Sequence, residues 1–117
     1  MFVNVMGTKY KILKKKYSED PYFASAGCDG YCDFNTKSIS ICDLSTYPGF
    51  ERMSKEYCEN SNKQTLRHEL VHAFLYESGL DSCSNHINSW ARNEEMVDWF
   101  AIQGPKIYDA WVKAKAI

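Results

Sequence analysis

Two different patterns of apolar and polar residues divide the chain. In the first 45 residues apolar and polar positions tend to alternate, as they do in half-buried strands. The segment KYKILKKKY (9–17) predicts a strand whose lysines lie on an exposed face or edge. Alternation at Ile39 and Ile41 predicts the second arm of a hairpin over 30–43.

The later residues follow the spacing of helices instead. Apolar side chains recur with the helical period before Gly79, which is expected to end the longest helix. Gly104-Pro105 is expected to break the helical region near the C-terminus. The expected helices are 49–60, 63–78, 91–103 and 106–116. Strands followed by helices predict an α+β fold, with a small, mostly antiparallel sheet packed on helices 63–78 and 91–103.

Length and charge narrow the class of protein. The chain has 117 residues, which predicts one domain over 1–117, strand-rich over 1–45 and helical over 48–117. The formal net charge is −1, so no global charge attracts nucleic acid or a membrane surface. Neither a membrane span nor a secretion signal is apparent, and we expect a cytoplasmic protein.

Five cysteines are present at irregular spacing. An odd count is a poor disulfide framework, and only Cys28 and Cys32 lie close together in the sequence. A structural zinc site would need a second close pair. We therefore expect reduced thiols.

The segment LRHELVHAFL (66–75) carries the strongest chemical signal. His68 and His72 lie four residues apart, so a helix presents both imidazoles on one face, where they can bind a zinc ion. Glu69 is placed to accept a proton from water activated by that ion. The structural alternative is a core helix with two satisfied histidines and no metal.

A catalytic zinc site needs a third protein ligand. The segment NEEMVD (93–98) offers Glu94, which follows His72 by 22 residues and shares a helix face with Asp98. Glu94 is predicted as the third ligand. Asp98 is predicted to hydrogen-bond the free nitrogen of a zinc-binding histidine. Glu95 points to another face and is expected to be a solvated acid.

Two further residues are candidates for stabilising a transition state. His86, in the loop between the two central helices, is either a solvated histidine or such a donor. Tyr76, one helical turn after His72, is either a core residue or a hydroxyl donor in the cleft.

HELVH followed by NEEMVD resembles the gluzincins, the thermolysin-like zinc peptidases with two His ligands and one Glu ligand. The segment EEMVDWFA (94–101) also resembles the glutamate helix of ImmA/IrrE-type metallopeptidases, which are associated with phage and mobile elements. The resemblance covers roughly residues 64–103. It implies a zincin-like fold, one zinc ion per chain and a peptide or protein substrate.

These observations leave two functions open. The first is a zinc peptidase that hydrolyses peptide bonds with Glu69 as general base, with strand 39–42 bordering the cleft. The second is a zinc-stabilised binding module without turnover, acting on a transcriptional regulator of a mobile element. The short chain supports the second, as does the lack of any histidine after Glu94.

Overall fold

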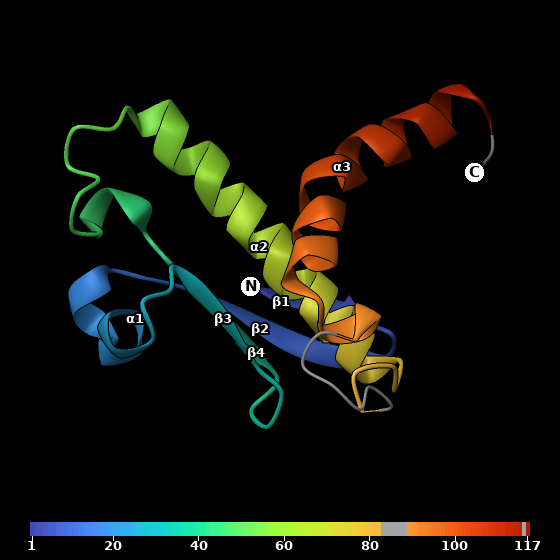
Figure 1. The fold of residues 1–117 in the computed structure, drawn as a ribbon, viewed down its shortest axis with the longest axis horizontal. Helices are drawn as coiled ribbons and strands as arrows, with labels where there is room; N and C mark the ends of the chain where they lie inside the picture. The colour runs from blue at the N-terminus through green and yellow to red at the C-terminus, as the bar shows by residue number, and fades with distance from the viewer. Residues whose placement is uncertain (83–88, 116) are drawn as a thin grey trace.

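The computed structural model describes residues 1–82, 89–115 and 117, and it combines one four-stranded sheet with three α-helices (Figure 1). The strands are β1 (Phe2–Val5), β2 (Thr8–Lys15), β3 (Gly30–Asp33) and β4 (Ser38–Cys42). Their order in the sheet is β1-β2-β4-β3. The predicted α+β class is confirmed. The sheet is mixed, because β2 and β4 run parallel while the other two pairs are antiparallel.

Tight turns join the antiparallel pairs. Met6 and Gly7 both have positive φ, as a two-residue hairpin loop between β1 and β2 requires. In the β3–β4 turn, Asp33 accepts hydrogen bonds from the backbone N–H groups of Asn35 and Thr36 at 2.9 and 3.2 Å. The hairpin predicted over 30–43 is confirmed.

The strand order decides one open alternative and corrects one expectation about edges. The strand predicted over 9–17 exists as β2, but it lies between β1 and β4, so its exposed lysines mark a face and not an edge. β4 is also an inner strand, and the outer strand on that side is β3. The expectation that residues 39–42 border a cleft is therefore wrong.

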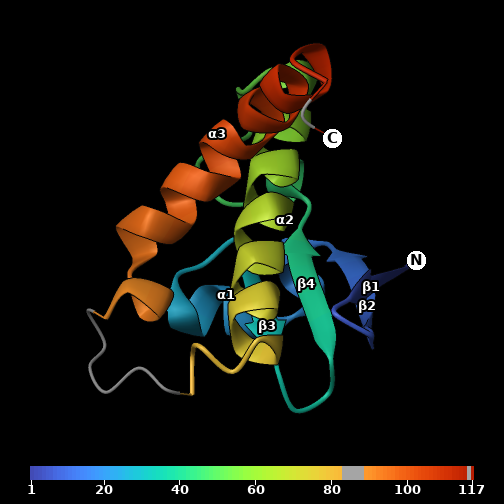
Figure 2. The ribbon, with the colours of Figure 1, turned by 90° about the vertical axis from the view of Figure 1, so that its right-hand side faces the viewer.

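Helix α2 (Lys55–Glu77) joins the second half of the helix predicted over 49–60 to the one predicted over 63–78, while residues 49–54 form turns, so the predicted start at 49 is wrong. Ser54 caps its first turn by accepting a hydrogen bond from the Tyr57 N–H. No residue between the two predicted segments breaks the helix, so α2 forms one rod across the sheet (Figure 2). The core between α2 and the sheet contains Val5, Tyr10, Ile39, Ile41, Leu66, Leu70 and Ala73.

Helix α3 (Glu94–Lys113) continues through Gly104-Pro105, so the predicted break is wrong. Proline has no N–H, which leaves the carbonyl four residues earlier without its helical donor. That carbonyl belongs to Ala101, and the Nε–H of Arg67 on α2 donates to it at 2.5 Å. A tertiary hydrogen bond therefore replaces the missing helical one.

Shorter elements connect these parts. Helix α1 (Pro21–Ala26) was not predicted. Asp20 caps it by accepting from the Tyr22 N–H, and it also binds Lys15 Nζ and the Tyr31 hydroxyl, both at 2.6 Å. The 3₁₀ turns are Tyr17–Glu19, Leu44–Thr46 and Trp90–Arg92.

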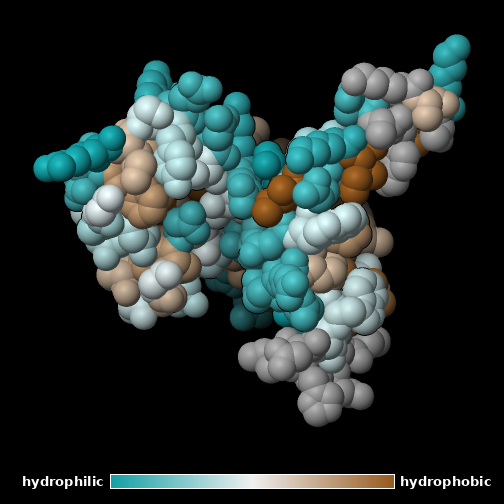
Figure 3. Space-filling view, turned by 45° about the horizontal axis from the view of Figure 1, so that its top comes forward, coloured by the Kyte–Doolittle hydropathy of each residue, from teal (hydrophilic) through white to brown (hydrophobic). Residues whose placement is uncertain are grey.

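Three further features concern the tilt of α3, the length and apolar character of the helices, and the cysteines. The second half of α3 leans away from α2, and apolar side chains on α3 face the indentation between them (Figures 1 and 3). Within the described ranges, no helix has both the length and the apolar character needed to cross a bilayer. Four cysteines are free thiols, as predicted, and Cys83 lies outside the described residues.

Candidate metal centre and its cleft

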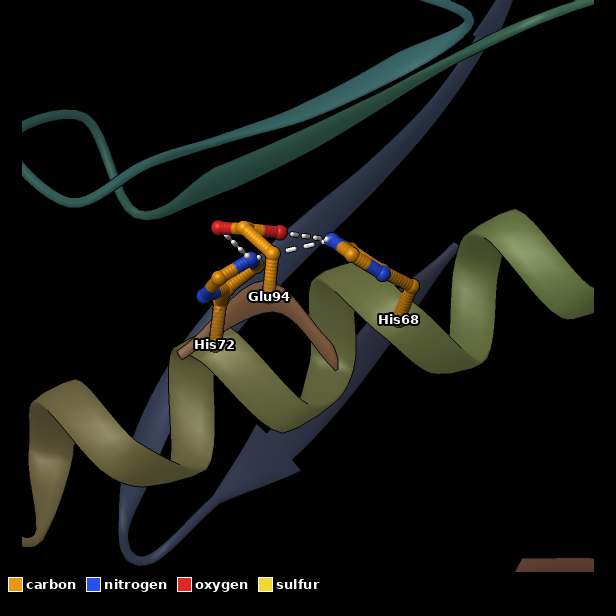
Figure 4. Close-up of side chains that lie close together, drawn as sticks. All are labelled: His68, His72 and Glu94. Carbon is orange, nitrogen blue, oxygen red and sulfur yellow. Dashed lines mark hydrogen bonds and ion pairs between the residues drawn. The ribbon is translucent and has the colours of Figure 1, made fainter. Parts of the chain in front are cut away.

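Two side chains of α2 meet a third from a distant part of the sequence. His68 and His72 project from the same face of α2, one turn apart, and Glu94 reaches them from the first residue of α3 (Figure 4). One possible ligand atom from each residue lies within 4.8 Å of the other two. The structure therefore brings together the three ligands that the sequence predicts.

The spacing of these atoms suits a small tetrahedral ion. The Nε2 atoms of His68 and His72 are 3.0 Å apart. Oε2 of Glu94 lies 3.1 Å from Nε2 of His68, and Oε1 of Glu94 lies 3.3 Å from Nε2 of His72. Ligands at about 2.0–2.1 Å from a tetrahedral zinc ion are separated by roughly 3.3 Å along each edge. The Nε2–Nε2 distance is close to one such edge, while each Nε2 faces a different Glu94 oxygen.

Asp98 orients one of the two imidazoles. Its Oδ1 atom lies 2.6 Å from Nδ1 of His68, one turn along α3 from Glu94. With Asp98 ionised, the Nδ1–H donates to the carboxylate, which leaves the lone pair of Nε2 directed at Glu94 and His72. This is the tautomer that binds a metal through Nε2.

Burial favours the neutral form of the second imidazole. Desolvation lowers the pKa of His72, although the nearby Glu94 carboxylate partly opposes this effect. A histidine must be neutral at the nitrogen that coordinates a metal. At neutral pH the His72 ring is therefore mostly neutral.

Glu69 lies on the buried side of the same helix. It is only 7% exposed, and burial raises its pKa to about 7. His68 lowers this pKa, while the carboxylates of Glu94, Asp29 and Asp98 raise it. A carboxyl group with a pKa near neutrality can both accept and release a proton at working pH.

The cluster of His68, His72 and Glu94 opens into a cavity of about 620 Å³. The end of α1, strand β3, α2 and the start of α3 form its walls. Four carboxylates line it, and no lysine or arginine of the described ranges does. The four acids are Asp29, Glu69, Glu94 and Asp98.

One wall of this cavity depends on a glycine whose role the sequence did not reveal. A Cβ atom at Gly30 would lie 2.5 Å from Cγ2 of Thr65, so only glycine lets β3 approach α2 this closely. The Thr65 hydroxyl also donates to Asp29 at 2.8 Å, which ties the start of β3 to the helix. Sequence reasoning missed these three residues, because their partners lie about 35 positions away.

The remaining candidates lie elsewhere. Glu95 is exposed, as expected. The ring of Tyr76 stacks on Phe34 with centroids 4.2 Å apart, below Lys37, and Tyr76 does not line the cavity. His86 lies outside the described residues. The exposed ring of Tyr22 and the side chain of Gln64 do line the cavity, and neither was predicted.

Comparisons of the chain with protein families, with curated proteins and with solved structures find no match. The resemblance of the two motifs to gluzincins accordingly stays a prediction. The chemistry of the site has to be inferred from its residues and their geometry.

Proposed function

We propose that the protein is a zinc-dependent peptidase, with His68, His72 and Glu94 as the metal ligands. The observation that carries the proposal is the convergence of two imidazole Nε2 atoms and one carboxylate. The Nε2 atoms are 3.0 Å apart, each lies 3.1 or 3.3 Å from one of the two Glu94 oxygens, and one possible ligand atom per residue lies within 4.8 Å of the other two. The orientation of His68 by Asp98 supports the same proposal.

Each residue then has one task. A zinc ion bound here supplies Lewis acidity toward water and toward a substrate carbonyl. Glu69, which lines the cavity beside the three ligands, would take a proton from the attacking water and return it to the leaving amine. Asp98 holds the His68 ring and its tautomer throughout.

Strand β3 gives the cleft a means of holding a polypeptide. It is the outer strand of the sheet, and residues 30–32 line the cavity beside the metal centre. An extended peptide can add to such an edge through main-chain hydrogen bonds. A protein substrate fits this arrangement, and the motif resemblance suggests a transcriptional regulator of a mobile element.

A zinc-stabilised binding module is the second candidate. The described lining of the cavity supplies no lysine, arginine or further histidine to stabilise an oxyanion. In such a module the metal would hold α2 and α3 together, and peptide binding would occur without hydrolysis.

One experiment separates the two candidates. Protein purified without an affinity tag is compared with Glu69→Gln and with a control, Glu95→Gln. The control removes the exposed acid that follows Glu94 in the sequence. We expect about one zinc per chain in all three, by elemental mass spectrometry. In a peptide-pool cleavage assay, Glu69→Gln should lose roughly 10²-fold or more in rate while Glu95→Gln stays unchanged.

Other outcomes assign the function differently. Zinc in all three proteins without Glu69-dependent cleavage would favour the binding module. Absence of metal, even after zinc is offered and the excess removed, would reject both candidates and leave α2 as a core helix.

A further inference from the structure

A second, smaller hollow adjoins the cleft. Its volume is about 220 Å³, and it lies where the end of α1 meets the segment after β4. Its lining is mostly apolar or aromatic, with one acid. The lining residues are Gly27, Cys28, Asp29, Leu44, Tyr47 and Phe50.

The hollow shares a wall with the candidate active site. Gly27, Cys28 and Asp29 line both spaces, so a single short segment of backbone separates them. This segment leads directly into β3, the outer strand along the cleft.

The walls of the hollow are held in place by packing. Leu44 is 3% exposed, and the rings of Tyr47 and Phe50 meet edge to face with centroids 5.8 Å apart. Tyr17 packs on the other side of Tyr47 at 4.8 Å. The hollow is therefore a preformed apolar surface, and its volume is below the roughly 300–1,000 Å³ of sites for whole small molecules.

The position of the hollow relates it to the reacting bond. α2 runs alongside β3 in the same direction, since Thr65 contacts Gly30 while Tyr76 stacks on Phe34. Thr65 donates to Asp29, which lines the hollow, and it lies roughly 8 Å along the helix from the midpoint of the two histidines. That length corresponds to about two or three residues of an extended peptide.

We propose that this hollow binds one large apolar side chain, such as Phe, Leu, Tyr or Met, of the polypeptide that occupies the cleft. It thus selects substrates by a residue a few positions away from the cleaved bond. The inference rests on the proposed function for the identity of the occupant as a peptide. Filling an apolar pocket of this kind changes affinity or kcat/KM by roughly 10- to 100-fold.

The test measures binding separately from turnover. Wild-type protein and Glu69→Gln, both incubated with zinc, are immobilised and used to select from a displayed library of random dodecapeptides. We expect the captured peptides to share a large apolar residue at one position. Wild-type protein is also assayed for cleavage of the captured peptides, and the distance from the selected residue to the cut is mapped by mass spectrometry.

Two substitutions change the hollow and one serves as the control. Phe50→Trp narrows the space and should shift the selected residue toward Val or Ala. Phe50→Ala removes one aromatic wall and should reduce the preference by about tenfold. Phe2→Trp alters an exposed Phe on β1, at the opposite edge of the sheet, and should leave the selection unchanged.

The outcomes distinguish this inference from the proposed function. Captured peptides that share an apolar residue but are not cleaved would support the hollow and count against the peptidase. Cleavage without an apolar preference, or with a preference that both Phe50 variants leave intact, would overturn the hollow and keep the peptidase. Capture of no common sequence by either protein would also overturn the hollow.

Discussion

The hydrogen bond from Arg67 to the Ala101 carbonyl predicts how much the contact between α2 and α3 contributes to the free energy of unfolding. Pro105 cannot donate to that carbonyl, and Ala101 is 1% exposed, so water cannot easily replace the arginine. Arg67→Met keeps most of the apolar stem and removes the donor. The substitution should leave the buried carbonyl without a partner.

The size of the effect follows from that lost donor. An unsatisfied buried carbonyl costs about 1–3 kcal/mol, so Arg67→Met should lower the free energy of unfolding by about 2 kcal/mol. Pro105→Ala restores an N–H four residues after Ala101, and on its own it should stabilise α3 by up to about 3 kcal/mol. In that background Arg67→Met should cost less than about 1 kcal/mol.

Urea denaturation of the four proteins, followed by circular dichroism, measures this coupling. A difference of at least about 1 kcal/mol between the two costs of Arg67→Met supports the explanation. Equal costs with and without proline would refute it, because the arginine would then act independently of the missing N–H. Unchanged slopes of the denaturation curves serve as the check that unfolding stays two-state.

Three more predictions address the cleft wall, a helix cap and the metal. Gly30→Ala should destabilise the fold by about 1–3 kcal/mol in urea denaturation, and Thr65→Ser in the same chain should recover most of it by removing the clashing methyl group. The Lys15 ammonium and the Tyr31 hydroxyl hold the pKa of Asp20 at about 2, below its ordinary 3.8. The ionised Asp20 therefore contributes fully to the free energy of unfolding above pH 3.8, and this contribution is lost as the pH falls toward 2. Allowing for screening by water, Asp20→Asn should lower the free energy of unfolding by about 1–2 kcal/mol at pH 7. The free energy of unfolding of this variant should then depend less on pH between 3.8 and 2, and an unchanged acid transition would contradict this. With free zinc at 100 times Kd, bound zinc should raise the free energy of unfolding by about 2.7 kcal/mol, and a chelator should remove this gain. In the same thermal scan, the stability of His72→Asn should change with neither zinc nor chelator.

Local spacing was enough to predict much of the candidate site. His68 and His72 share a face of α2 because four residues make about one helical turn, and Glu94 and Asp98 share a face of α3 for the same reason. The alternation at Ile39 and Ile41 predicted the strand β4 but not its burial, because Ser40 and Cys42 on the other face are buried as well. These features depend on the period of one element and on nothing outside it.

Helix boundaries were predicted less well. Gly104-Pro105 is a helix-breaking signal, yet α3 continues because Arg67, on another helix, supplies the hydrogen bond that proline removes. A local signal fails where a partner distant in sequence outweighs it. Helix α1 was missed although its signals are local: Asp20 is its N-cap, Pro21 its first residue and Gly27 its C-cap.

The sequence by itself determined which residues carry the candidate chemistry, since ligand type and helical spacing are local properties. Only the tertiary structure decided that β3 and not β4 borders the cleft, and that Gly30 must be small for the strand to meet Thr65. It also decided that an apolar hollow opens next to the acidic cavity. The reason is physical: strand order, close approach and empty space arise from packing between segments far apart in the chain, and no period within one segment encodes them.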